Sequence, residues 1–278
     1  MDYRGKVAVV TGAGSGIGRA LAVELARRGT RLAISDVNDA ALDETVALCE
    51  KAGGDGHKYH LDVADRAAVL AHAEDVTRDL GNANLVINNA GVALMAPVEE
   101  MSWEDLDWLM GINFWGMVNG SKAFLPHLIA SGDGHLVNIS SVFGFIGIPT
   151  QSAYNAAKFG VRGFTESLRQ EMLIARHPVA VSCVHPGGIK TNIARDARSS
   201  REDMDRDERA TAFERASRTT PEKAAEIILR GVDRKKPRIL VGPDAYLFAA
   251  IPRLTGAGYQ RPLAALVRLG GKRMGIEL

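Results

Sequence analysis

The chain has 278 residues, of which 46% are apolar and 24% charged, so it is large enough to bury the core of one large domain. Its formal net charge of +1 gives no overall basic field, which argues against nucleic acid as a partner. The two cysteines, Cys49 and Cys183, lie in apolar-rich segments, as is typical of reduced thiols in a cytoplasmic protein. Only a short apolar run follows the first polar residues, so neither a signal peptide nor a membrane span is predicted.

Short apolar runs alternate with longer helical patterns along most of the chain. Strands are predicted over residues 6–12, 31–36, 57–63, 84–91, 134–141, 179–187 and 237–242, and helices over 16–29, 39–54, 65–81, 101–130, 152–173 and 221–232. This alternation indicates a parallel sheet covered on both faces, which right-handed crossovers make doubly wound. The predicted fold class is α/β: one domain with a mostly parallel seven-stranded sheet, a Rossmann fold that binds ligands outside the carboxyl ends of its strands.

Two segments depart from this alternation. Residues 194–218 are dense in charge, and two interpretations stay open: a solvated surface, or a mobile substrate lid over about 190–218. The tail 243–278, which follows the predicted domain 1–242, combines apolar clusters with basic residues: Arg253, Arg261, Arg268, Lys272 and Arg273. Packing against the fold or another subunit is the first expectation for this tail. Contact with a membrane surface is the alternative.

The stretch VVTGAGSGIG, residues 9–18, follows the first predicted strand and opens the first helix. Its glycines fit G-x-x-x-G-x-G better than G-x-G-x-x-G, because Ile17 stands where the latter needs its last glycine. Small residues let the backbone approach a diphosphate, and a helix start offers free N–H groups to it. We therefore predict dinucleotide binding by Gly12, Ser15, Gly16, Ile17 and Gly18.

Asp36 ends the second predicted strand, 18 residues after Gly18. A carboxylate there can accept hydrogen bonds from both ribose hydroxyls and repels a 2′-phosphate, and neither residue 15 nor residue 37 is basic. NAD is therefore predicted over NADP. At the end of the third strand, Asp62 and the Val63 backbone are placed to bind the adenine. Asp65 is the better candidate for capping the next helix.

Tyr154 and Lys158 stand four residues apart in a predicted helix, so their side chains share one face. A free phenol, with a pKa of about 10, is a poor base near neutrality. A nearby ammonium and a positively charged nicotinamide both stabilise phenolate, and we expect them to lower this pKa. The pair alone is weak evidence, because the same spacing arises by chance in many helices.

Five motifs in order make the chain resemble the short-chain dehydrogenase/reductase family over about residues 6–242. They are TGAGSGIG, NNAG (88–91), GINFWG (111–116), NISS followed by YNAAK (138–158), and HPGGIKT (185–191). The resemblance implies four catalytic residues, Asn113, Ser141, Tyr154 and Lys158, with Ser141 chosen over Ser140 because it lies thirteen residues before the tyrosine. It implies further cofactor contacts at Asn89, Ala90, Gly91, Tyr154, Lys158, Pro186, Gly187, Ile189 and Thr191. No metal site is expected.

The substrate pocket is predicted to be lined by residues 93–97, residues 142–150 and the segment after Thr191. The first two stretches are largely apolar and lack Arg and Lys, which favours a secondary alcohol or ketone with apolar flanks. The predicted function is NAD-dependent interconversion of such compounds, with Tyr154 as general base and acid. The alternatives are a catalytically silent dinucleotide-binding sensor or scaffold, and a membrane-surface lipid or steroid dehydrogenase. The resemblance also implies a homo-oligomer, a dimer or tetramer, through the helices at about 101–130 and 152–173.

Overall fold

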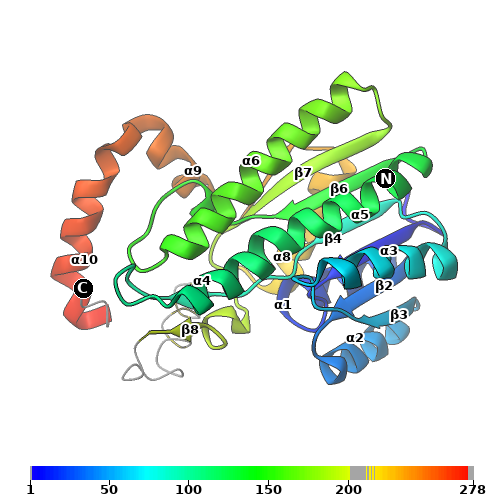
Figure 1. The fold of residues 1–278 in the computed structure, drawn as a ribbon, viewed down its shortest axis with the longest axis horizontal. Helices are drawn as coiled ribbons and strands as arrows, with labels where there is room; N and C mark the ends of the chain where they lie inside the picture. Colours follow the sequence, from blue (N-terminus) through cyan, green and yellow to red (C-terminus); the bar gives the residue numbers. More distant parts are fainter. Residues whose placement is uncertain (1, 201–210, 212, 214, 216, 275–278) are drawn as a thin grey trace.

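A seven-stranded sheet, parallel throughout, forms the centre of the computed structural model, which describes residues 2–200, 211, 213, 215 and 217–274 (Figure 1). Its spatial order is β3 (Asp55–His60), β2 (Arg31–Asp36), β1 (Val7–Thr11), β4 (Leu85–Asn88), β6 (Gly134–Ile139), β7 (Val179–Pro186) and β9 (Arg238–Val241). From β1 the chain adds β2 and β3 on one side of the sheet and then returns to add β4, β6, β7 and β9 on the other. The switch point between β1 and β4 is where a doubly wound fold binds ligands. The predicted fold class is confirmed.

Helices cover both faces of this sheet (Figure 1). On one face α1 (Gly16–Arg27), α2 (Asp39–Lys51) and α8 (Pro221–Asp233) enclose an apolar core, and on the other α3 (Arg66–Leu80), α5 (Met117–Ala130) and α6 (Ser152–Ile174) enclose a second. Because strand side chains alternate between faces, Val10 belongs to the first core and its neighbour Val9 to the second. The buried strands are therefore apolar on both sides.

The edge strand β3 is the exception to these apolar strands. Its sequence DGHKYH is mostly exposed, and the strand begins and ends earlier than the predicted 57–63. Lys58 pairs with Asp43, and His60 Nδ1 lies 3.2 Å from the Asp39 carboxylate, so its polar side chains reach α2. Charged side chains on an edge strand protect it from pairing with another sheet.

The helix predicted over 101–130 consists of three consecutive segments. α4 (Trp103–Met110) leads into a π-helical segment, η1 (Gly111–Gly116), and then into α5. The glycines of this region permit close packing, since a Cβ at Gly116 would lie 2.6 Å from the Val63 side chain and one at Gly120 would lie 2.2 Å from Asn88 Oδ1. The end of the π-helical segment thus lies close to the residues after β3, and the first turn of α5 lies close to the carboxyl end of β4.

A second, two-stranded parallel sheet was not predicted. It pairs β5 (Leu94–Met95) with β8 (Arg198–Ser199). Between these two strands the chain forms the short helices η2 (Val142–Gly144) and η3 (Asn192–Ala194). The pairing brings the chain after Thr191 back to the predicted pocket stretch 93–97. Part of the predicted lid, residues 201–210, 212, 214 and 216, lies outside the described residues.

The C-terminal tail forms a helical arm beside the sheet domain (Figure 1). It consists of α9 (Pro243–Thr255), η4 (Gly256–Tyr259) and α10 (Gln260–Met274). The arm contacts its own fold, because the Tyr259 hydroxyl accepts a hydrogen bond of 3.0 Å from the Gly147 amide. Within the described ranges no helix is both long and apolar enough to cross a membrane.

Candidate active site

The glycine-rich turn between β1 and α1 requires its glycines. Gly12 and Gly16 have φ angles of 64° and 53°, a left-handed backbone that glycine adopts freely. A Cβ at Gly18 would lie 2.1 Å from the Gly12 carbonyl oxygen, and one at Gly12 would lie 2.7 Å from Ala90 Cα. The turn is therefore packed directly against the NNAG segment, as a backbone-lined phosphate cradle requires.

The start of α1 has no side-chain cap, like the starts of α5, α6 and α9 among the described helices. Its N-cap residue Ser15 accepts no hydrogen bond with its side chain, whereas Asn38, Asp65, Ser102 and Thr220 cap α2, α3, α4 and α8 in this way. The first amide groups of a helix need an acceptor, and an anionic ligand can supply one. The segment of Gly16, Ile17 and Gly18 therefore fits a diphosphate.

Asp36 reaches this turn from the end of β2. Its Oδ2 accepts a hydrogen bond of 2.9 Å from the Gly14 amide, and its Oδ1 accepts one of 3.1 Å from the Asn38 amide. The carboxylate thus lies beside the glycine turn, where the sequence placed an adenosine ribose. Asp62 is exposed and accepts a hydrogen bond from the Ala64 amide, next to the buried Val63.

The NNAG segment joins the cofactor end of the fold to β1. The Asn89 side-chain amide donates to the carbonyl oxygens of Thr11 and Gly12 at 2.9 and 3.1 Å. The Asn89 and Ala90 backbone amides both donate to the Thr11 hydroxyl. These four hydrogen bonds fix the carboxyl end of β4 against the glycine-rich turn.

Gly91 lies where three elements meet. A Cβ there would be 3.3 Å from Asn113 Oδ1 and 3.5 Å from Lys158 Nζ, so the asparagine of η1 and the lysine of α6 are neighbours. Asn113 is 1% exposed and exchanges two hydrogen bonds of 2.8 Å with the Val92 backbone. The buried Lys158 ammonium donates to the Ile139 carbonyl oxygen at 3.1 Å. Asn113 is therefore a buried residue that holds the loop after β4.

Tyr154 lies on α6 and Ser141 follows the end of β6, and the Ser141 side chain lies close enough to the phenol to lower its pKa. The Phe143 ring meets the Tyr154 ring edge to face at 6.0 Å between centroids. Ser140 turns elsewhere, because its hydroxyl donates to the Lys158 carbonyl oxygen at 2.8 Å. The structure thus brings Ser141, and not Ser140, to the phenol.

In the chain alone, burial shifts the pKa values of both members of the pair. Burial raises the pKa of Tyr154 to about 12, and the Ser141 side chain opposes that rise. Burial lowers the pKa of Lys158 to about 8. The ammonium lies 5.5 Å from the centroid of the phenol ring. Desolvation is therefore the main influence on the phenol in the chain alone, and at neutral pH the phenol carries its proton.

The HPGGIKT segment closes the site at the end of β7. The Gly187 amide donates to the Val241 carbonyl oxygen at 2.9 Å, directly after Pro186. The Gly188 amide donates to Asp244 Oδ2 at 2.7 Å, and a Cβ at Gly187 would lie 2.2 Å from the same oxygen. Asp244, in the first turn of α9, therefore occupies the space that a larger residue at 187 would need.

Ile189 and Thr191 continue this segment toward the cofactor end. Ile189 is buried and pairs with Thr219 in an isolated parallel bridge. The Thr191 methyl carbon would lie 3.0 Å from a Cβ at Gly16. The two predicted cofactor-binding segments thus meet across the carboxyl ends of the strands.

Comparisons with known proteins agree with this geometry. The family model for short chain dehydrogenases matches residues 6–202. The chain belongs to the short-chain dehydrogenase/reductase family. SadH of Mycobacterium tuberculosis (strain ATCC 25618 / H37Rv), named as an oxidoreductase, is 52% identical over 265 residues, which are 95% of this chain and 96% of SadH. As the family assignment implies, this chain is an oxidoreductase with a Rossmann nucleotide-binding fold.

Solved structures of family members contain both dinucleotides. A short-chain dehydrogenase/reductase from Burkholderia phymatum in complex with NAD has a TM-score of 0.85 and 30% identity, covering 94% of this chain and 96% of that chain. A metagenomic short-chain oxidoreductase in complex with NADP has a TM-score of 0.70 and 28% identity, covering 87% and 98%. The family thus uses NAD or NADP.

Two polar residues that support this dehydrogenase site were not singled out from the sequence. His185 Nδ1 lies 3.0 Å from the Ser141 carbonyl oxygen, and because a carbonyl only accepts, Nδ1 carries the proton. The ring is fully buried and lies 4.1 Å from the Phe145 ring, and burial lowers its pKa to about 4. Asn155 donates to the carbonyl oxygens of Phe143 and Ile146, both at 2.7 Å. His185 stands in HPGGIKT and Asn155 in YNAAK, and a polar residue inside such a motif was the only sign in the sequence that either has a role at the site.

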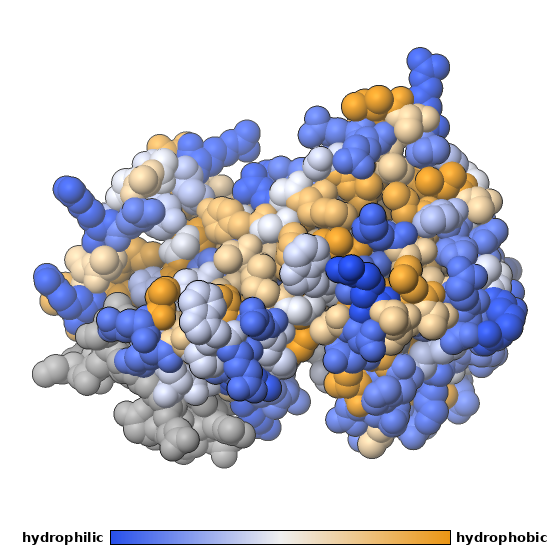
Figure 2. Space-filling view, viewed as in Figure 1, coloured by the Kyte–Doolittle hydropathy of each residue, from blue (hydrophilic) through white to orange (hydrophobic). Residues whose placement is uncertain are grey.

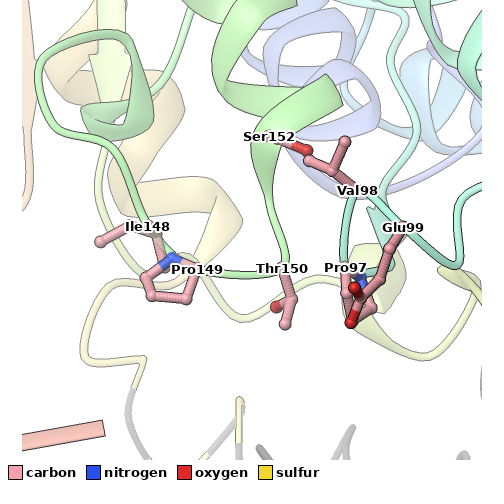
Figure 3. A pocket seen from close by; sticks show the side chains of 7 residues that line it. All are labelled: Pro97, Val98, Glu99, Ile148, Pro149, Thr150 and Ser152. Carbon is pink, nitrogen blue, oxygen red and sulfur yellow. The ribbon is translucent and has the colours of Figure 1, made fainter. Parts of the chain in front are cut away.

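A groove of about 520 Å³ opens beside the start of α6 (Figure 3). It is lined by Pro97, Val98, Glu99, Ile148, Pro149, Thr150 and Ser152. Residues 97 and 148–150 of this lining fall within the stretches predicted for the substrate pocket. The predicted apolar lining is incomplete, because Glu99, Thr150 and Ser152 are polar. The groove does not include the phenol itself, which lies two residues beyond Ser152 on the same helix.

Proposed function

We propose that this chain is an NAD-dependent oxidoreductase that interconverts a secondary alcohol and a ketone with apolar flanks. The observation that carries the proposal is the convergence of Ser141, Tyr154 and Lys158 at the carboxyl ends of the strands, next to a glycine turn that fits a diphosphate. Asn113 completes the set. A silent sensor or scaffold would have no need of a hydroxyl, phenol and ammonium in contact.

A bound nicotinamide would supply the hydride chemistry at the substrate carbon. The glycine turn, Asp36 and the segment from Pro186 to Thr191 would hold this cofactor, and Lys158 would bind its ribose. The chain's own task is to manage one proton on the substrate oxygen. Tyr154, protonated at neutral pH, is suited to donate that proton as a carbonyl is reduced.

The remaining site residues orient this proton transfer. The Ser141 hydroxyl is placed to donate a hydrogen bond to the substrate oxygen as negative charge develops there. In the opposite direction the Lys158 ammonium stabilises the phenolate that must accept the alcohol proton. The Asn113 side chain is fully engaged with Val92, so it holds the loop after β4 and fixes the start of a proton path from Lys158.

The preference for NAD rests on Asp36. Its carboxylate lies beside the Gly14 amide at the end of β2, where a 2′-phosphate would meet a negative charge. Residues 15 and 37 are serine and valine, which offer no positive charge to a phosphate. The buried free thiols Cys49 and Cys183 support a cytoplasmic location.

A homo-oligomer is also part of the proposal. Apolar residues gather over the face formed by η1, α5 and α6 (Figure 2). The exposed large apolar side chains there are Trp115, Phe159, Leu173 and Ile174. Burying such a patch between two copies would remove it from water.

The test is a panel of secondary alcohols and ketones, with NADH absorbance as the readout and NAD and NADP compared. Tyr154→Phe removes only the hydroxyl, so we expect NAD binding to persist and turnover to fall at least about a hundredfold, the lower range for a positioned acid–base group. Tyr246→Phe, at an exposed tyrosine of α9, is the matched control and should leave turnover unchanged. NAD binding without turnover on any compound would favour the sensor.

A further inference from the structure

The C-terminal arm presents apolar side chains to solvent on both of its long helices. On α9, Leu247 and Leu254 are exposed and lie seven residues apart, on the same face, while Ala245 on another face is buried. On α10, Leu266 and Leu269 are 64% and 81% exposed. Their own fold covers none of these four leucines.

Basic residues flank this apolar surface. Arg253, Arg261 and Arg268 are all exposed, and on a helical wheel each lies to one side of the exposed leucines of its helix. Residues 243–278 contain five basic residues against two acidic ones, whereas the whole chain carries only +1. One of the two acids, Asp244, is turned into the fold at Gly188. At the left of Figure 2, hydrophilic side chains project beside apolar ones on this arm.

We propose that the arm binds an anionic lipid surface, with its leucines among the acyl chains and its arginines at the phosphates. Exposed apolar residues flanked by basic ones are the pattern of helices that lie in a membrane interface, and anionic lipid complements the arm's charge. A second copy of the arm does not, because a two-fold contact would bring like charges together. The apolar face of α5 and α6 suits a second copy better.

The binding also defines the substrate, an inference that rests on the proposed function. Tyr259, between α9 and α10, accepts a hydrogen bond from Gly147, and the next residue, Ile148, lines the groove. A membrane that holds the arm therefore lies next to the groove at the start of α6, the helix that carries the phenol. The substrate is accordingly an apolar alcohol or ketone dissolved in the bilayer.

The experiment is co-sedimentation of the full chain with vesicles of phosphatidylcholine, alone or mixed with phosphatidylglycerol. We expect binding to the mixed vesicles that weakens at high salt. The triple variant Arg253→Gln, Arg261→Gln, Arg268→Gln should bind about a hundredfold more weakly, since each basic residue near an anionic surface contributes about fivefold. The triple variant Leu254→Gln, Leu266→Gln, Leu269→Gln should also lose binding. Leu70→Gln, at an exposed leucine of α3, is the matched control and should bind as the parent does.

Failure of this inference is distinct from failure of the proposed function, because vesicle binding requires no turnover. All of these substitutions are at exposed residues outside the catalytic set, and circular dichroism checks that each variant folds. No binding to mixed vesicles, equal binding to phosphatidylcholine alone, or unchanged binding of both triple variants would overturn it. So would a smaller oligomer in sedimentation velocity of the leucine variant, which would make the arm a contact between copies.

Discussion

His185 offers a test of how the serine is positioned, because it holds Ser141 from the main-chain side. Its Nδ1 donates to the Ser141 carbonyl oxygen at 3.0 Å, while its ring lies against Phe145. His185→Phe keeps a flat ring in this space and removes the donor. His185→Asn keeps a donor near the position of Nδ1 and removes most of the ring. The two substitutions therefore separate the hydrogen bond from the packing.

The expected effect is modest, and the structure says why. The Ser141 carbonyl oxygen also accepts a hydrogen bond of 3.0 Å from the Gly144 amide, so losing His185 does not leave it without a partner. The relevant figure is then the net value of one hydrogen bond, about 0.5–1.5 kcal/mol, and not the larger cost of an orphaned group. If the lost hydrogen-bond free energy is expressed as poorer positioning of the Ser141 hydroxyl in the transition state, kcat falls about two- to tenfold in His185→Phe.

The assay is kcat and KM on the best compound of the alcohol and ketone panel. His72→Phe is the control, since His72 is also buried with its pKa lowered to about 4 by desolvation, and it packs between aromatic rings at Tyr59 and Phe124. Neither of its ring nitrogens has a hydrogen-bond partner. We expect kcat to be reduced in His185→Phe, restored in part in His185→Asn and unchanged in His72→Phe. Parent-like kcat in His185→Phe would refute the positioning role.

Three further outcomes are expected. Asp36→Ala should reduce the NAD over NADP preference in kcat/KM, and an unchanged ratio would remove the ribose assignment. Asp244→Ala should raise the KM for the cofactor about tenfold with little change in kcat, because the loss of a charge-assisted acceptor loosens the turn after β7. The folded pKa values of His72, His135 and His185 are about 4, below the unfolded value of about 6.5, so the folded state binds fewer protons. Stability should therefore fall as pH drops from about 6.5 toward 4, by up to about 4 kcal/mol per pH unit for three protons, and His72→Phe should flatten this slope by about a third in urea titrations.

The sheet and its main helices could be predicted because their signal is local. Runs of β-branched residues and helical periodicity lie within each segment, so six helical regions and seven strands appear near their predicted positions. The two-residue strands β5 and β8 could not be found in this way, since two residues carry no period. The exposed edge strand β3 was misplaced at its ends because its side chains, such as Lys58, do not alternate with burial.

The motif residues of the site were also predictable, but their partners were not. Asp244 reaches the Gly188 amide across 56 positions of sequence, His185 reaches Ser141 across 44, and Tyr259 reaches Gly147 across 112. Each contact depends on how distant elements meet, and no spacing in the sequence encodes it. The contacts of Asp244 and Tyr259 tie the C-terminal arm to the rest of the fold, which a division of the chain at residue 242 would not suggest.

The opposed shifts at Tyr154 and Lys158 have one further consequence. Burial raises the pKa of the phenol to about 12 and lowers that of the ammonium to about 8, so burial shifts both groups toward their neutral forms while Lys158 stays mostly charged at neutral pH. A phenol in this state can give a proton but not take one. The positive charge that would reverse this belongs to an oxidised nicotinamide and is absent from a reduced one. We therefore expect the Tyr154 pKa, followed as tyrosinate absorbance against Tyr154→Phe, to fall on adding NAD and not on adding NADH. An equal shift with both would mean that the positive charge of the nicotinamide is not what lowers the pKa of the phenol.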